Sequence, residues 1–158
     1  MPTHYRTATP RDATACARII RAWGEEVADW IDPMDALAPM AAFWAEVFAA
    51  HPTWVAEEAG EILGFANRED LHLCGLYVAR VARGRGIGKH LLDLARAGQP
   101  RMIAWSYASN THARHFYRRE GFVELGREVE PGTGLLNVEH LWTVAPRPAP
   151  RPGPAPAA

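Results

Sequence analysis

The stretch that decides the fold runs from Leu71 to Ala97 and reads LHLCGLYVARVARGRGIGKHLLDLARA. Its first part is an apolar run of strand length, and its last part repeats leucine and alanine at helical spacing. Between the two parts lies a loop rich in glycine and arginine, residues 80–89. The stretch therefore predicts a buried strand, a tight loop and a helix in immediate succession.

The loop has the composition of an anion-binding corner. Gly84, Gly86 and Gly88 stand at every second position, so backbone N–H groups can turn toward one point without Cβ atoms in the way. The helix that follows adds its unpaired first-turn N–H groups and the positive end of its dipole. We therefore expect the loop to bind an anion, and a phosphate fits best.

Two familiar phosphate-binding motifs do not fit this loop. A Walker loop has four residues between its glycines and then Lys-Ser/Thr, whereas three residues separate Gly84 from Gly88 and His90 follows Lys89. A dinucleotide fingerprint reads G-x-G-x-x-G, whereas this loop reads G-x-G-x-G. On its own the loop is also compatible with a flexible turn that carries solvated arginines.

A second informative stretch, SNTHARHFYRREGFVELG, covers residues 109–126. Asn110 is a good N-cap, and Ala113, Phe116 and Tyr117 lie on one face of the helix that it would begin. Gly121 stands where a helix end tolerates a left-handed backbone. By itself, a helix with such an aromatic stripe would belong to a core.

Together the two stretches resemble the GNAT superfamily of N-acetyltransferases. The residues Arg83-x-x-Gly86-x-Gly88 are similar to the family's Q/R-x-x-G-x-G/A acetyl-CoA motif, and the preceding strand ends at the family's usual distance. The resemblance covers roughly residues 3–143. The second stretch is similar to N-x-x-A-x-x-F-Y-x-x-x-G-F, with matches at Asn110, Ala113, Phe116, Tyr117, Gly121 and Phe122.

The resemblance implies an α/β (α+β) architecture, the GNAT fold. This is a mixed, mostly antiparallel sheet of six to seven strands, flanked by about four helices and splayed between the fourth and fifth strands. The apolar pattern places a first helix over residues 13–30, in which Gly24 is a point of interruption, and a break between Pro33 and Pro39. Further helices are expected near 40–50, 86–97 and 110–120, and strands near 4–8, 53–57, 62–67, 71–78, 101–107, 122–128 and 135–144.

The resemblance also implies that acetyl-CoA lies in the splay as a cosubstrate. Backbone amides of residues 83–88 would hold its pyrophosphate, cationic side chains of the loop could add contacts, and the pantetheine arm would pair with the end of the 71–78 strand. No metal is expected. The expected cofactor-binding residues are Leu76, Tyr77, Val78, Arg83, Gly84, Arg85, Gly86, Ile87, Gly88, Lys89 and Asn110.

The implied reaction is direct transfer of an acetyl group from sulfur to a primary amine. Tyr117 matches the residue that protonates the thiolate in the family, although a core aromatic is the alternative for it. The backbone N–H of Val78 is a candidate to polarise the thioester carbonyl. The base is open: Asp70, His72 and Glu69 are candidates, and each could also be an ordinary polar residue at a strand end.

The remainder of the chain sets the context. Its 158 residues make one domain, expected at 1–144, and a proline-rich disordered tail is expected at 145–158. A net charge of −1 argues against nucleic acid and a membrane surface as partners. Cys16 and Cys74 are far apart and are expected as buried free thiols, and the N-terminus has no apolar signal core. We therefore expect a cytoplasmic location.

Residues 25–38 carry five carboxylates beside Trp30. They form either a solvated acidic helix end or, as the resemblance implies for this region, part of an acceptor site suited to a cationic amine. The favoured function is an acyl-CoA-dependent N-acetyltransferase that acts on a small-molecule or protein amine. The alternative is a GNAT-fold module that binds acyl-CoA without catalysis, and a homodimer is open in either case.

Overall fold

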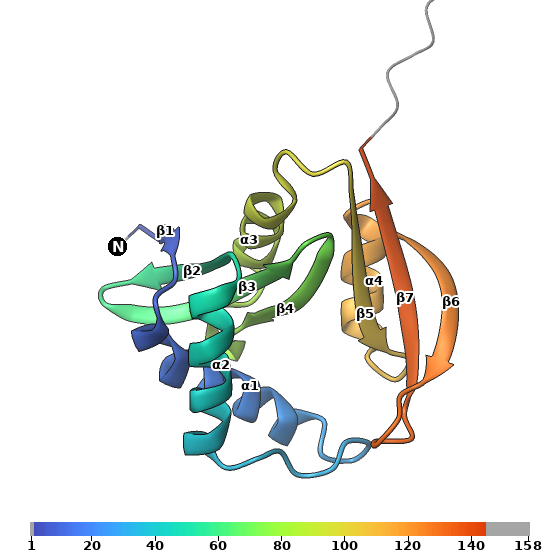
Figure 1. Ribbon diagram of the computed structural model, residues 1–158, viewed down its shortest axis with the longest axis horizontal. Coiled ribbons are helices and arrows are strands. Elements are labelled where there is room, and N and C mark those ends of the chain that lie inside the picture. The colour runs from blue at the N-terminus through green and yellow to red at the C-terminus, as the bar shows by residue number, and fades with distance from the viewer. Residues whose placement is uncertain (1, 145–158) are drawn as a thin grey trace, which may run out of the picture.

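The computed structural model describes residues 2–144, so the proline-rich tail expected at 145–158 lies outside the described residues. Within that range, no helix is both long and apolar enough to cross a bilayer. Seven strands form one sheet in the order β1-β2-β3-β4-β5-β7-β6. The strands are β1 (His4–Thr7), β2 (Thr53–Glu58), β3 (Glu61–Glu69), β4 (His72–Val78), β5 (Arg101–Tyr107), β6 (Val123–Val129) and β7 (Leu136–Thr143), and the helices are α1 (Ala13–Glu26), α2 (Leu37–Ala50), α3 (Ile87–Arg96) and α4 (Thr111–Arg119) (Figure 1).

All neighbouring strands are antiparallel except β4 and β5, which run parallel. The β4–β5 ladder joins only His72 with Ile103 and Leu73 with Ala104. Beyond these two pairs the strands part, and Figure 1 shows β1 to β4 diverging from β5 to β7. The mixed, mostly antiparallel sheet splayed between the fourth and fifth strands is thereby confirmed.

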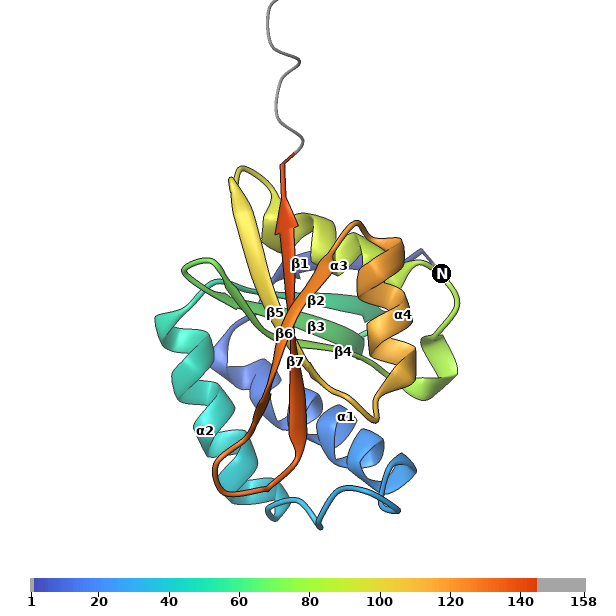
Figure 2. The same ribbon diagram turned by 90° about the vertical axis from the view of Figure 1, so that its right-hand side faces the viewer.

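Helices cover both faces of the sheet, and each face has its own core. Figure 2 shows α1 and α2 on one side of β1–β4 and α3 and α4 on the other. On the first side, Phe65 and Val55 are fully buried against Ile20 of α1 and Phe48 of α2. On the second side, the buried residues of the core are Ala56, Leu63, Ala66, Leu73, Ala82, Ile87, Leu91, Leu92, Ala95, Met102, Ala104, Tyr117 and Phe122.

The first two helices differ from the prediction at their facing ends. Helix α1 stops at Glu26 rather than near Trp30, and Gly24 does not interrupt it. A Cβ on Gly24 would lie 2.8 Å from the sulfur of Met34, so the glycine lets the α1–α2 connection pack on the helix. Helix α2 begins at Leu37 and includes Pro39, because a proline in the first turn lacks only an N–H that would be unpaired there anyway.

The cysteine prediction is correct for one residue and wrong for the other. Cys16 is a buried free thiol on α1, and burial raises its pKa to about 12. Cys74 is free but exposed. The β3–β4 register pairs Leu73 with Arg68 and Gly75 with Asn67, so Cys74 sits in a β-bulge without a partner in the ladder.

Candidate active site

A cavity of about 630 Å³ occupies the space where β4 and β5 part. Its lining joins segments that are far apart in the sequence: the end of α1, β4, the glycine loop, β5 and α4. Of the residues predicted to bind the cofactor, Arg85 alone does not line it. The cavity is lined by Leu76, Tyr77, Val78, Arg83, Gly84, Gly86, Ile87, Gly88, Lys89 and Asn110 among others.

The backbone of Val78 is turned toward this cavity. Ala79 donates its N–H to the carbonyl of Leu63 at 2.7 Å, and Val78 faces Gly64 in the register. In an antiparallel ladder this pattern makes Val78 and Gly64 a non-hydrogen-bonded pair, so the N–H and C=O of Val78 point away from β3. The Val78 carbonyl accepts a hydrogen bond from Nε of Arg83 at 3.0 Å. The N–H of Val78 therefore faces the space between β4 and β5, where it can donate to a ligand.

The glycine loop has the backbone that an anion site needs. Gly84 and Gly86 have φ values of +78° and +82°, which L side chains rarely adopt, and a Cβ on either would meet no other atom within 4 Å. Helix α3 starts directly after Gly86, so the N–H groups of its first turn have no acceptor within the helix. This corner fits a diphosphate by its backbone geometry.

Three cationic side chains of the loop, those of Arg83, Arg85 and Lys89, already have carboxylate partners. Arg83 contacts Glu26 of α1 through two nitrogens at 2.7 and 3.1 Å. Arg85 points to Glu58 of β2, at 2.6 Å. Lys89 is paired with Glu120 and Asp93. A phosphate would therefore compete for these cations, and the backbone amides are its first partners.

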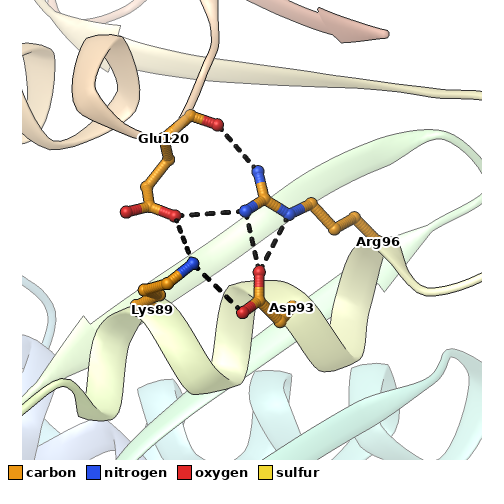
Figure 3. Close-up of polar contacts among 4 residues, drawn as sticks. All are labelled: Lys89, Asp93, Arg96 and Glu120. Atoms are coloured by element: carbon orange, nitrogen blue, oxygen red, sulfur yellow. Dashed lines mark hydrogen bonds and ion pairs between the residues drawn. The ribbon is translucent and has the colours of Figure 1, made fainter. Parts of the chain in front are cut away.

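Lys89 belongs to a four-residue ionic network that fastens α3 to the end of α4 (Figure 3). Its ammonium contacts Glu120 at 3.1 Å and Asp93 at 3.3 Å, and these hydrogen bonds raise the pKa of Lys89. Arg96 donates to both carboxylates and to the Glu120 carbonyl. The network fixes the helix whose N-terminus carries the glycine loop.

Tyr117 lines the cavity from α4 and is only 7% exposed. Its ring packs between Phe116, Phe122 and His140. Burial raises the pKa of the Tyr117 phenol well above its ordinary value. The hydroxyl therefore keeps its proton at neutral pH and stays a hydrogen-bond donor.

The structure does not bring the candidate bases to this place. Asp70 is exposed in the β3–β4 turn with a φ of +50°, and His72 is exposed at the start of β4. Neither residue lines the cavity. Asn110 does line it, and its Oδ1 also accepts the N–H of Ala113 at 3.1 Å, which confirms the predicted helix cap.

Comparison with known proteins places this geometry in a family. Residues 49–124, which contain β4, the glycine loop and α4, match the model of the acetyltransferase (GNAT) domain. This segment, just under half of the chain, is similar to the GNAT superfamily. The GNAT resemblance seen in the sequence is thereby confirmed.

Curated relatives of this chain are named N-acetyltransferases. The chain is 39% identical over 70 residues to the peptidyl-lysine N-acetyltransferase YiaC of Escherichia coli. The aligned residues are 44% of this chain and 48% of that protein. It is 35% identical over 77 residues to the peptidyl-lysine N-acetyltransferase YjaB of Salmonella typhimurium, 48% of this chain and 53% of that protein. The alignments thus span about half the length of these relatives.

Solved GNAT structures share the fold over nearly the whole chain. The apo form of YjaB from Escherichia coli superposes with a TM-score of 0.73 at 21% identity, covering 89% of this chain and 97% of that one. The acetyltransferase yncA of Salmonella typhimurium, solved with acetyl-CoA, gives a TM-score of 0.70 at 23% identity, covering 95% and 98%.

Two polar pairs at this cavity were not singled out from the sequence. Ser106 of β5 lines the cavity, and its Oγ lies 2.7 Å from Nε2 of His140, which is 1% exposed. Tyr107, the next residue of β5, donates its hydroxyl to Glu130 at 3.0 Å. Local spacing gives no signal for either pair, because Ser106 and His140 lie on different strands and Tyr107 meets Glu130 from the turn after β6.

Proposed function

We propose that this chain is an acetyl-CoA-dependent N-acetyltransferase that moves an acetyl group directly to a primary amine. The observation that carries the proposal is that one cavity is lined by both the glycine loop and the Tyr117 phenol. A phosphate-binding corner alone would serve a binding module equally well. A buried, protonated phenol beside it supplies what a transfer reaction requires.

The residues that would hold acetyl-CoA follow from the backbone. Amides of residues 84–88 would bind the diphosphate, and β4 near Val78 would accompany the pantetheine arm. When bound, acetyl-CoA supplies the activated acetyl thioester. The free N–H of Val78 is suited to donate to the oxygen that gains negative charge as the amine attacks.

Proton transfer completes the reaction. An alkylamine has a pKa of about 10, so it must lose a proton before or during attack on the thioester. Tyr117 would donate its proton to the departing sulfur. Asp70 and His72 stay our candidates for the base, and because neither lines the cavity, either would have to act through water.

The relatives support a particular acceptor. YiaC and YjaB are named peptidyl-lysine N-acetyltransferases, and a lysine side chain is a primary amine on a flexible stem. We therefore extend the proposal to exposed lysine residues of proteins. The free thiols of Cys16 and Cys74 support placing this activity in a reducing cytoplasm.

The test is incubation with acetyl-CoA and a panel of amines while free thiol is measured. Release of CoA that depends on an amine, with an acetylated product found by mass spectrometry, is the expected result. Tight binding of CoA without release by any panel member would instead identify a non-catalytic acyl-CoA-binding module.

A further inference from the structure

One wall of the cavity is built from aromatic rings in contact. Trp23 of α1 lies edge-on to Tyr77 of β4, with centroids 5.7 Å apart, and to Trp30, at 6.0 Å. Trp30 in turn lies edge-on to Tyr107 of β5, at 5.7 Å. Four rings thus form a continuous chain from β4 across α1 to β5, and Trp23, Tyr77 and Tyr107 line the cavity. Aromatic faces attract cations.

Glu130 stands beside this aromatic wall and also lines the cavity. Its Oε1 accepts hydrogen bonds from the hydroxyls of Tyr107 at 3.0 Å and Thr133 at 2.9 Å. Its Oε2 accepts one from the amide of Asn137 at 3.2 Å. Burial, and then this contact with Glu130, raises the pKa of Tyr107 to about 12, so the phenol remains a donor. The carboxylate is therefore fixed in position.

The charge of Glu130 has no cationic partner among residues 2–144, because all three groups that bond to it are neutral. Glu26, the other carboxylate of the cavity lining, is different, since Arg83 neutralises it at 2.7 Å. Three neutral donors thus hold the carboxylate of Glu130 in place without neutralising it, as a group that binds a cation requires.

We propose that Glu130 and the aromatic wall of Trp23, Tyr77 and Tyr107 bind the alkylammonium group of the acceptor. This inference deepens the proposed function and rests on it for the identity of the ligand as an acceptor. The chemistry that the site recognises is a positive charge on an apolar stem, attracted by the carboxylate and by the ring faces. Neutral aromatic amines gain nothing from the charge.

A binding experiment tests the subsite without any turnover. Butyltrimethylammonium cannot be acetylated, and its binding is followed through the fluorescence of the cavity tryptophans. We expect E130Q, which keeps the shape of the side chain, to weaken this binding about tenfold. E128Q is the matched control, because Glu128 is exposed on β6, two residues before Glu130, and does not line the cavity. Equal affinities in E130Q and the unsubstituted protein would overturn the proposal.

A second variant covers the case in which E130Q does not fold, as judged by circular dichroism. Glu130→Asp keeps the charge but retracts it by one methylene group, and we expect it to weaken butyltrimethylammonium binding about threefold. Unchanged affinity in this folded variant would likewise overturn the subsite.

Kinetics separate this inference from the proposed function. We expect E130Q to raise the KM for butylamine about tenfold and to leave the KM values for 4-methylaniline and acetyl-CoA unchanged. An equal rise for both amines would contradict the subsite while the transferase stands. Binding of butyltrimethylammonium that depends on Glu130, with no acetyl transfer to either amine, would refute the transferase and leave the cation site in place.

Discussion

Tyr117 is the side chain on which the proposed chemistry depends most. It is buried, it lines the cavity, and its raised pKa keeps the phenol protonated at neutral pH. We expect Tyr117→Phe to lower kcat about a hundredfold or more, because the leaving sulfur loses its proton donor, while the affinity for acetyl-CoA changes little. Steady-state kinetics and calorimetric titration measure the two effects.

Tyr5→Phe is the control for this prediction, since Tyr5 stacks on His90 outside the cavity. A Tyr117→Phe enzyme with full kcat would show that another group protonates the sulfur. A parallel loss in Tyr5→Phe would show that the effect is not specific to the cavity.

His140 is a buried residue that should make the stability of the protein depend on pH. Burial lowers its pKa below the ordinary value of 6.5, so the folded protein holds the imidazole neutral beside Ser106. The unfolded chain takes up the proton at a higher pH than the folded chain does. The free energy of unfolding should therefore fall as the pH drops below about 6.5, by at most roughly 1.4 kcal/mol per pH unit for this group.

Urea unfolding at several pH values between 8 and 5 measures this slope. His140→Gln should flatten it, whereas His115→Gln, a change on the exposed face of α4, should not. The same slope in His140→Gln and the unsubstituted protein would assign the pH dependence to other groups.

In the glycine loop, the effect of a substitution on acetyl-CoA binding can be separated from its effect on backbone strain. Gly86 and Gly98 have similar left-handed φ values, +82° and +73°, and a Cβ on either meets no other atom within 4 Å. Replacing each with alanine should cost a similar free energy of unfolding, about 1–2 kcal/mol. Only Gly86 lines the cavity.

We therefore expect Gly86→Ala to weaken acetyl-CoA binding about tenfold or more, since the amides it orients are those proposed to meet the diphosphate, and Gly98→Ala to leave binding intact. Isothermal titration provides both affinities. Equal affinities in the two variants would mean that the loop backbone does not form the phosphate site.

The ionic network between α3 and α4 should contribute to the free energy of unfolding. Glu120 is 8% exposed and holds both Lys89 and Arg96 (Figure 3). Glu120→Gln removes the more buried of the two carboxylates that Lys89 and Arg96 share and should lower the free energy of unfolding by about 1–3 kcal/mol. Asp93→Asn, at a side chain that is 47% exposed, should cost no more than about 0.5 kcal/mol. Equal losses in urea unfolding would contradict this difference.

Across the whole molecule, the sequence correctly predicts the turns and caps that depend only on neighbouring residues. The Ala59-Gly60 hairpin, the glycine turn before α3 and the Asn110 cap each need only neighbouring residues, and each is present. The end of α1 was placed too late because the apolar stripe continues to Trp30, whereas the helix stops at Glu26. Trp30 instead lies edge-on to Trp23 and Tyr107, two rings of the aromatic wall.

The site was harder to predict where it depends on the order of the strands. Tyr107 and Glu130 are 23 residues apart, and Ser106 and His140 are 34 apart. They meet because β7 lies between β5 and β6. Asp70 stays a candidate base by its position in the chain, but the sequence does not show that β4 and β5 are still paired at His72 and part only beyond Leu73.

A crystal structure with CoA bound would show whether the glycine loop holds the diphosphate and whether Tyr117 reaches the sulfur. We expect the diphosphate on the backbone amides of residues 84–88 and the CoA sulfur within hydrogen-bonding distance of the Tyr117 hydroxyl. A diphosphate bound elsewhere, or a sulfur far from the phenol, would contradict it.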